Sequence, residues 1–438
     1  MNSTLSSEKL SRTQIGQIMS AFSGWLMDGY TSIAYLVVAI TFSNVFFPAK
    51  FSQALLLIFL GLVVGSVARL IGSLILGNFL GDRLGRKKML IYSIMGFSFS
   101  SFLIAFIPTY KTVGYLATVI LYSLLFVVGL FAGAEYAGGT ALSMESVPQK
   151  KRMPVGAFVQ SGYGVGYFLI LLVAAGFTGY FGQAQSTNLV WRALFATTII
   201  PGIIALVIRL SSKESPVFDE MKNKNEIEHI PAEGMLKQWY ALLAALFIVV
   251  GLLLLNTITL GFYPTLIPML YPILYGTATN DLYNSYINLI SLFGVWIGGF
   301  AAYIIFRRRV TLLLFSTIFL ISIVPLYLLA MSGSVFLTVL AFAIQAFIEA
   351  AIFSTIPAYL AEVFQKTHRT TTIGVVYNGA AVPASFGISA VLLLGGHGFF
   401  NSDSISWLLF LFIGAIILII GIIMSKESSN LKNDPILN

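Results

Sequence analysis

Four charged side chains stand inside long apolar stretches of the sequence, and their types define the chemistry that the chain could perform. Three are acids, Asp28, Glu135 and Glu349, and the fourth is Arg69. A charge at the middle of a bilayer costs roughly 2.5–3.5 kcal/mol on insertion scales, so each residue is a candidate functional group. A carboxyl group against an apolar wall can exchange a proton near neutral pH. A guanidinium group can hold a carboxylate or a phosphate through two parallel hydrogen bonds.

We predict that Asp28 and Glu135 are the proton-coupling pair and that Arg69 binds an anionic substrate. In the alternative interpretation, Arg69 forms a permanent salt bridge to Asp28 or Glu135, and one acid only neutralises it. Both interpretations hold in turn if the substrate replaces the acid as the partner of Arg69 during the transport cycle. Glu349 follows Gln345 by four residues, so the two share a helix face. Glu349 is either a substrate contact or a second proton site.

Several uncharged polar side chains lie at membrane depth as well. Most such groups make hydrogen bonds between helices, and the many Phe and Tyr residues serve mainly in packing and as interface anchors rather than as an aromatic cage. Besides Arg69 and Glu349, the candidate substrate-binding residues are Gln160, Asn256, Gln345, Tyr377 and Asn378.

The composition identifies a membrane protein. Of 438 residues, 58% are hydrophobic and 10% are charged, whereas a soluble chain carries about 25% charged residues. The polar segment Met1–Gln14 has no features of a cleaved signal peptide. The chain has no cysteine, which excludes disulfides and thiolate metal sites, and we expect neither a metal nor a cofactor.

Apolar segments long enough to cross a bilayer recur along the chain. The sequence predicts an all-α membrane protein with twelve spans, at residues 16–46, 52–79, 89–109, 113–143, 153–181, 189–210, 238–264, 283–306, 310–331, 335–360, 370–396 and 405–425.

The basic residues fix the expected orientation. With the N-terminus inside, 21 of the 25 Lys and Arg residues fall on the cytoplasmic side, so we expect both termini in the cytoplasm of a cell whose plasma membrane the chain spans. These charges are spread over seven cytoplasmic segments, which argues against a nucleic-acid partner.

An internal repeat divides the chain. Glu145 and Arg152 lie seven residues apart after the fourth span, and Glu362 and Arg369 lie seven apart after the tenth, an offset of 217 residues. We therefore predict two six-helix bundles, residues 1–212 and 238–438, joined by a cytoplasmic loop at 213–237. Related bundles with a site between them are typical of transporters.

Several motifs resemble those of a known family. The segment LGNFLGDRLGRKKML at 76–90 resembles the signature after span 2 of the major facilitator superfamily. The motifs GAEYAGGTALSMESVPQKKR at 133–152, KESPVF at 213–218 and LAEVFQKTHRTTTIGVVYN at 360–378 resemble its metabolite:proton symporter branch. The resemblance implies that spans 1, 4, 7 and 10 line a central cavity, which would place all three acids on cavity helices.

The resemblance also implies a cytoplasmic gate that holds the outward-open state. Asp82, Arg86 and Glu145 would form this network with Arg152 nearby, and Glu362 and Arg369 would do the same in the second half. The expected gating residues are Asp82, Arg83, Arg86, Glu145, Arg152, Glu362 and Arg369. The branch's Arg and Gln early in span 4 are absent from the segment LFVVG at 125–129, so the substrate cannot be copied from a relative.

The sequence thus predicts a secondary transporter, a monomer in the lipid bilayer, that couples protons to the uptake of a small anionic metabolite. An organic acid, a phosphate or a sugar acid would satisfy Arg69. The alternatives are a proton-driven exporter of hydrophobic cations and a neutral sugar symporter. An enzyme is not expected, because the three histidines fall in loops and no nucleophile–base pair lies at membrane depth.

Overall fold

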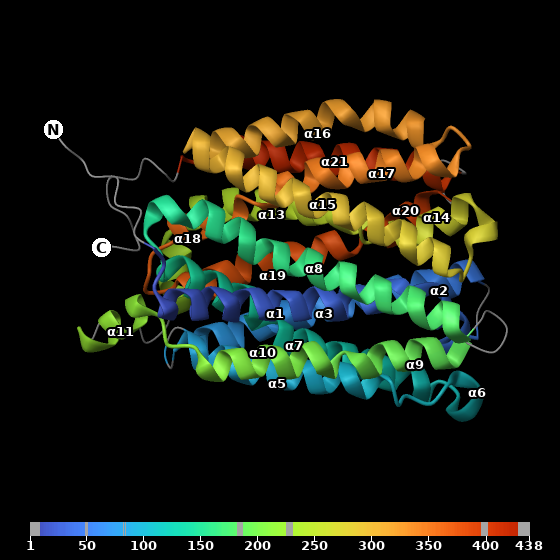
Figure 1. Ribbon diagram of the computed structural model, residues 1–438, viewed down its shortest axis with the longest axis horizontal. Coiled ribbons are helices and arrows are strands. Elements are labelled where there is room, and N and C mark those ends of the chain that lie inside the picture. The colour runs from blue at the N-terminus through green and yellow to red at the C-terminus, as the bar shows by residue number, and fades with distance from the viewer. Residues whose placement is uncertain are drawn as a thin grey trace.

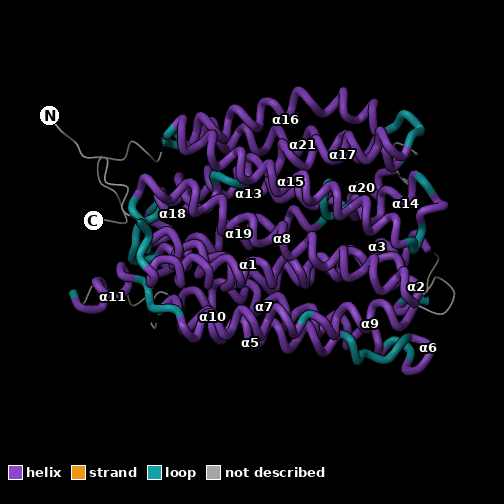
Figure 2. The backbone as a smooth tube through the Cα atoms, in the orientation of Figure 1, coloured by secondary structure: helices purple, strands orange, loops and turns teal. Residues whose placement is uncertain are grey.

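The computed structural model describes residues 9–48, 51–81, 83, 85–181, 187–224, 231–395 and 402–427. Every regular element within these ranges is a helix, and the long helices run roughly parallel to one axis (Figures 1 and 2). The helices of the first half of the chain form the lower part of the view, and those of the second half form most of the upper part (Figure 1).

The first half contains six spans in chain order. Their elements are α1 Arg12–Val37 with α2 Ala39–Phe46, α3 Phe51–Gly72 with the π-helical η1 Ser73–Gly81, α5 Arg86–Ile104, α7 Leu116–Glu145, α8 Gln149–Phe181, and α9 Thr187–Thr197 with α10 Ile199–Ser211. The short α6, Tyr110–Val113, links α5 to α7.

The second half repeats this order. Its elements are α13 Trp239–Ile258 with α14 Tyr263–Leu270, α15 Ala278–Ile305, α16 Arg308–Ala330, α17 Val335–Phe353 with α18 Ile356–Val363, α19 Arg369–Ser385 with α20 Gly387–Gly395, and α21 Asp403–Met424. The 3-10 turn η2 Pro272–Leu274 follows α14, and two short helices, α11 Pro216–Asn223 and α12 Pro231–Lys237, stand between the halves.

The described helices agree with the twelve predicted spans. Ten segments are long and apolar enough to cross a membrane, and the bent pair α1–α2 makes an eleventh. The remaining predicted span, at residues 89–109, corresponds to α5, which is not among these eleven segments. Its 19 residues begin with three basic residues, Arg86, Lys87 and Lys88. The structure is therefore an all-α membrane fold of two six-helix bundles.

Several predicted spans are divided between two helices, and two of these breaks lie in the first and seventh spans. The first bends by 58° between α1 and α2. The seventh was predicted as one helix over 238–264, but α13 ends at Ile258. Pro264 has no N–H to donate to the Leu260 carbonyl four residues earlier, and that carbonyl instead accepts a hydrogen bond from the Tyr167 hydroxyl at 2.6 Å. Since Tyr167 belongs to the first half, this hydrogen bond at the break connects the two bundles.

Two pairs of helices form most of the contact between the bundles: α8 packs on α15, and α3 packs on α19. Within the first bundle, α1 packs along α8, and a Cβ atom on Gly29 would overlap the backbone of Tyr163. Small residues of this kind permit close helix packing in lipid.

The molecule has two distinct ends. The basic end carries buried Arg86, Arg152, Arg308 and Arg369 together with both described chain ends, α11 and α18 (Figure 1). The far end carries α2, α6 and α14 (Figure 1). The central cavity lies between these ends.

Candidate substrate site and gate

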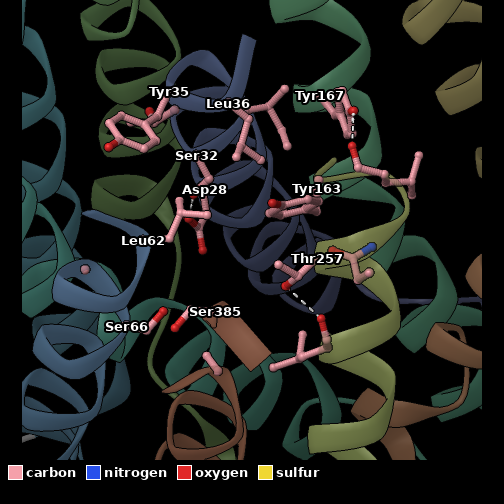
Figure 3. Close-up of a pocket in the computed structure, with 18 of the residues that line it drawn as sticks. Asp28, Ser32, Tyr35, Leu36, Leu62, Ser66, Tyr163, Tyr167, Thr257 and Ser385 are labelled. Carbon is pink, nitrogen blue, oxygen red and sulfur yellow. Dashed lines mark hydrogen bonds between the residues drawn. The ribbon is translucent and has the colours of Figure 1, made fainter. Parts of the chain in front are cut away.

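A cavity of about 240 Å³ lies between the two bundles. In the described part of the chain, its charged lining residues are Asp28 and Arg69, and uncharged polar groups from both halves complete the wall. Asp28, Ser32, Ser66, Tyr163 and Ser385 surround the open space in Figure 3. The volume lies below the ~300–1,000 Å³ of drug-sized ligand sites, which suits a small metabolite.

Asp28 and Arg69 form a bidentate ion pair across α1 and α3. Arg69 Nη1 donates to Asp28 Oδ2 at 2.8 Å, and Arg69 Nη2 donates to Asp28 Oδ1. Ser32 Oγ donates to the same carboxylate at 2.9 Å and accepts from Arg69 Nη2 at 3.1 Å. The Arg69 side chain is 18% exposed and the Asp28 side chain 0%. Both residues line the cavity, and the arginine is the more exposed of the two.

Besides Arg69, four of the predicted substrate residues line the cavity: Gln160, Asn256, Tyr377 and Asn378. Asn378 Nδ2 donates to the Gly133 carbonyl at 2.8 Å, a bond between the bundles. The Gln160 Oε1 atom has no hydrogen-bond partner within the described residues, although it is buried. An unpaired buried acceptor in a cavity wall is a natural contact for a substrate hydroxyl or amine.

Glu349 lies on a helix that lines the cavity through Ala350 and Phe353, but Glu349 and Gln345 are not themselves lining residues. Glu349 Oε1 accepts from Asn256 Nδ2 at 2.8 Å, and its Oε2 accepts from the Thr259 hydroxyl at the break in the seventh span. Gln345 Oε1 accepts from the Tyr263 hydroxyl at 2.7 Å. Glu349 can therefore act on a substrate through Asn256, and its role as a contact or proton site stays a prediction.

Glu135 also lies on a helix that lines the cavity, α7, through Leu125, Val128 and Gly129, but its own side chain is not part of the wall. Arg209 Nη1 donates to Glu135 Oε2 at 2.9 Å, a second bond joins Nη2 to Oε1, and Ser93 Oγ donates to Oε2 at 2.9 Å. Both side chains are 1% exposed. A Cβ atom on Gly24 would overlap this pair, so α1 passes directly over it.

Arg209 is the ion-pair partner of Glu135, which the sequence did not reveal. It lies two residues before the end of α10 and was counted among the cytoplasmic charges, but its guanidinium group is fully buried. Arg69 pairs with Asp28, and Glu135 has a cation of its own. The proton-coupling role of Glu135 remains a prediction, whereas the geometry of Asp28 connects that acid directly to the substrate cavity.

An aromatic cluster borders the ion pair. The rings of Tyr136 and Tyr377 stack with centroids 3.7 Å apart, and Trp25 contacts both rings and Tyr163, at 4.6, 5.8 and 5.2 Å. Trp25, Tyr163 and Tyr377 line the cavity. Trp25 was missed by the sequence analysis, although its position three residues before Asp28 places it on the same helix face. Its Nε1 donor has no partner within the described residues.

At the basic end, two buried glutamates each bind arginines from both bundles. Glu145 contacts Arg369 of the other half at 2.9 Å and Arg86 of its own half at 3.5 Å. Glu362 contacts Arg308 of its own half at 2.9 Å and Arg152 of the other half at 3.7 Å.

The predicted gating residues of the described part thus come together, and the contact between Arg86 and Glu145 follows the prediction. The sequence did not predict that Arg152 binds Glu362 and Arg369 binds Glu145, each across the two halves. These exchanged pairs hold the two bundles together at this end. Arg308 takes the position of Arg86 in the second half. Asp82 lies outside the described residues, and Arg83 is half-buried.

Two further glutamates, which the sequence analysis missed, repeat one contact in both halves. Glu214 Oε1 accepts from the Arg86 N–H at 3.0 Å, and Glu427 Oε1 accepts from the Arg308 N–H at 2.7 Å. Each acid thus stabilises the N-terminus of the helix that follows a basic turn. Burial raises the pKa of the Glu214 carboxyl above its ordinary value.

Comparison with known proteins agrees with this geometry. Residues 31–387 match the family model of the Major Facilitator Superfamily. The chain is 27% identical over 374 residues to the inner membrane metabolite transport protein YhjE of Escherichia coli (strain K12), which covers 83% of this chain and 84% of that protein. It is 26% identical to a putative proline/betaine transporter of Staphylococcus aureus (strain COL), over 74% of this chain and 69% of that protein.

A third relative matches over a shorter segment. The shikimate transporter of Escherichia coli (strain K12) is 32% identical over 223 residues, and the match spans half of each chain. Among solved structures, the xylose transporter XylE from E. coli, in a partially occluded inward-open conformation, has a TM-score of 0.73 at 16% identity, covering 97% of this chain and all of that one. This likeness shows a shared fold.

Proposed function

The chain belongs to the Major Facilitator Superfamily, and we propose that it performs proton-coupled symport of a small anionic metabolite by alternating access. It is a multi-pass membrane transporter and not an enzyme. The observation that carries the proposal is the Asp28–Arg69 pair, which supplies the described cavity with one cation and one acid.

Charge balance explains how this pair couples a proton to an anion. With the site empty, Arg69 and ionised Asp28 sum to zero. An anion that binds Arg69 competes for the guanidinium donors that now serve Asp28. An unpaired carboxylate in a low-dielectric wall is costly, so Asp28 takes up a proton. The loaded site, with Arg69, a monoanion and neutral Asp28, again sums to zero. Both states can therefore be enclosed without carrying a net charge through the membrane.

Hydrogen bonds between the bundles support alternating access. The exchanged pairs Arg369–Glu145 and Arg152–Glu362 close the basic end. In the cavity wall, Tyr167 donates to the Leu260 carbonyl and Asn288 Nδ2 donates to the Gly164 carbonyl at 2.7 Å. Release of the pairs at the basic end would open that end while the bonds in the cavity wall still join the bundles.

The cavity wall offers further contacts for a hydroxylated acid. The Trp25 Nε1 donor and the Gln160 Oε1 acceptor are both unpaired within the described residues. A carboxylate at Arg69 with hydroxyl groups at these atoms would satisfy all three. The similarity to the shikimate transporter supports this class of substrate.

A zwitterion is a second candidate, because the aromatic cluster stands beside Arg69. A carboxylate at Arg69 would place an attached ammonium group near the faces of Trp25, Tyr163 and Tyr377, where cation–π attraction stabilises it. The similarity to proline/betaine transporters points the same way. A hydrophobic cation alone fits less well, since Arg69 lines the cavity and already neutralises Asp28.

We further propose that the basic end faces the cytoplasm of a cell whose plasma membrane the chain spans, following the distribution of Lys and Arg. In this orientation the chain acts as a monomer, and the proton gradient is its energy source without a cofactor. The division into residues 1–212, 213–237 and 238–438 stays a prediction.

A panel of labelled compounds tests the substrate class. Proteoliposomes with an acid exterior would be supplied with shikimate, glycine betaine, xylose and tetraphenylphosphonium. We expect uphill uptake of shikimate, lost in Arg69→Ala and weakened in Arg69→Lys, because an ammonium group cannot form the guanidinium fork. Betaine uptake that creates a membrane potential would favour the zwitterion, since that substrate with one proton carries a net charge. Xylose uptake unaffected by Arg69→Ala would overturn the anion proposal.

A further inference from the structure

Asp281 is a buried acid that the proposed cycle does not use. It lies in the first turns of α15 at the far end and is 8% exposed. Thr178 Oγ1 donates to its Oδ2 at 3.5 Å, which links α15 to α8 of the other bundle. No ion pair to Asp281 occurs in the described part of the chain. The acid therefore has no cation that would hold it permanently ionised.

A stripe of polar side chains leads from Asp281 to the substrate cavity. Ser285, Asn288 and Ser291 follow it at helical spacing, and the last two line the cavity. The ten residue steps from Asp281 to Ser291 cover about 15 Å of helix. Asn288 faces α8, because its amide donates to the Gly164 carbonyl. Asp281 also contacts α8, and the stripe thus follows the boundary between the bundles.

Two oxygen atoms beside this stripe have no protein partner. The Ser285 hydroxyl and the Asn284 Oδ1 atom are buried, each residue being 1% exposed, and neither atom has a hydrogen-bond partner within the described residues. Buried polar groups of native proteins are satisfied by protein or by ordered water. Their position between an acid and a cavity is where a chain of water molecules would lie.

We propose that Asp281 is the outer proton-accepting group of a water-filled path along α15, which delivers protons from the far end to the cavity and to Asp28. A proton from bulk water binds the Asp281 carboxylate, leaves it for the first internal water, and moves along hydrogen-bonded oxygens past Ser285 and Asn288. The proposal rests on the proton coupling proposed above.

The elements packed against α15 agree with this role. The helices packed against α15 are α8, α14, α16 and α17. The ionisable side chains of α8, α14 and α16 in the described part at this end are tyrosines, Tyr180, Tyr263 and Tyr327, and the latter two donate their hydroxyls to Gln345 and Ser404. The ionisable side chain of α17 is Glu349, which accepts hydrogen bonds from Asn256 and Thr259. An acid in the first turn of a helix also stabilises the helix dipole. That simpler role predicts no effect on proton entry.

Cysteine accessibility tests the path without a substrate. The chain has no cysteine, so Ser285→Cys and Ile287→Cys give single reactive sites on the same helix. Ile287 is fully buried in the apolar core and serves as the matched control. With a small, water-soluble methanethiosulfonate applied from the far side, we expect Ser285→Cys to react at least tenfold faster. Equal rates would overturn the water path.

A second measurement tests Asp281 itself. Pyranine trapped in proteoliposomes reports the proton influx that accompanies uptake of shikimate or betaine. We expect Asp281→Asn to slow this influx several-fold and to shift its dependence on external pH. Thr178→Val, which removes the link to α8 and keeps the carboxylate, should behave as the wild type, and Asp281→Glu should restore the rate.

The outcomes separate this inference from the proposed function. A wild type that takes up these compounds without proton influx would overturn both. If the wild type couples protons and Asp281→Asn shows the same proton influx as the wild type, the path alone is overturned. The same holds if Asp281→Asn shows the same influx as Thr178→Val.

Discussion

Replacing Arg369 by glutamine should open the basic end of the protein. Arg369 donates to Glu145 at 2.9 Å, and both side chains are fully buried. The pair joins the two bundles, so it exists only while this end is closed. Arg86, at 3.5 Å from Glu145, belongs to the same bundle as the acid and continues to neutralise it in either state.

The size of the effect follows from this geometry. A hydrogen bond to a charged group contributes about 1.5–3 kcal/mol, and each 1.4 kcal/mol changes an equilibrium constant tenfold. Arg369→Gln should therefore shift the equilibrium toward the opened basic end by roughly 10- to 140-fold. The conformations of a cycling protein differ by only a few kcal/mol, so this shift is large enough to invert their populations.

Electron–electron distance measurements can detect the change at the far end. Tyr180 on α8 and Ile273 in η2 belong to different bundles and are 84% and 86% exposed, so spin labels on cysteines there should not disturb packing. Because alternating access closes the far end as the basic end opens, Arg369→Gln should gain a population with a shorter label distance. Arg307→Gln is the matched control, since Arg307 is an exposed arginine at the same end. A distance distribution identical in Arg369→Gln and wild type would refute the role of this pair as a gate.

Three further predictions concern the Glu135–Arg209 pair and Glu214. Glu135→Ala should destabilise the protein by about 3–5 kcal/mol in thermal unfolding, because it leaves Arg209 buried without a counter-charge; full stability of this variant would contradict the ion-pair account. The double variant Glu135→Leu with Arg209→Met should recover most of the lost stability, and uphill uptake by it would remove Glu135 from proton coupling. Gly24→Ala should cost about 1–3 kcal/mol through its overlap with that pair, and an unchanged melting temperature would show that α1 can move aside. The pKa of Glu214 is raised in the folded state, so the folded protein binds a proton at this carboxyl more tightly than the unfolded chain does. The free energy of unfolding should therefore decline as pH rises from about 4.5 through the raised pKa. Glu214→Gln should flatten this part of the stability–pH profile, and an unaltered slope would contradict the raised pKa.

The sequence predicted the helices and singled out the two charged residues that line the cavity, because both features depend on local composition. Long apolar segments specify spans, and a charge within one is rare enough to stand out, as Asp28 and Arg69 do. The repeat at Glu145 and Glu362 also predicted that the two halves carry equivalent gating residues.

The remaining features depend on contacts that local composition does not encode. A repeat identifies equivalent positions but not partners, so the exchange of Arg152 and Arg369 between the halves could not be predicted. Arg209 lies at a helix end by sequence, yet its long side chain reaches back to Glu135. Glu349 lies on a predicted cavity helix, and only the rotation of α17 turns it behind Asn256.

The central claim is that one anion and one proton enter the site together with no net charge. It is tested most directly by measuring shikimate accumulation in proteoliposomes under a pH gradient and, separately, under a membrane potential set with potassium and valinomycin. The account predicts accumulation driven by the pH gradient, no response to the potential, and loss of uphill accumulation with retained exchange in Asp28→Asn. Accumulation driven by the potential alone, or uphill uptake that survives in Asp28→Asn, would contradict it.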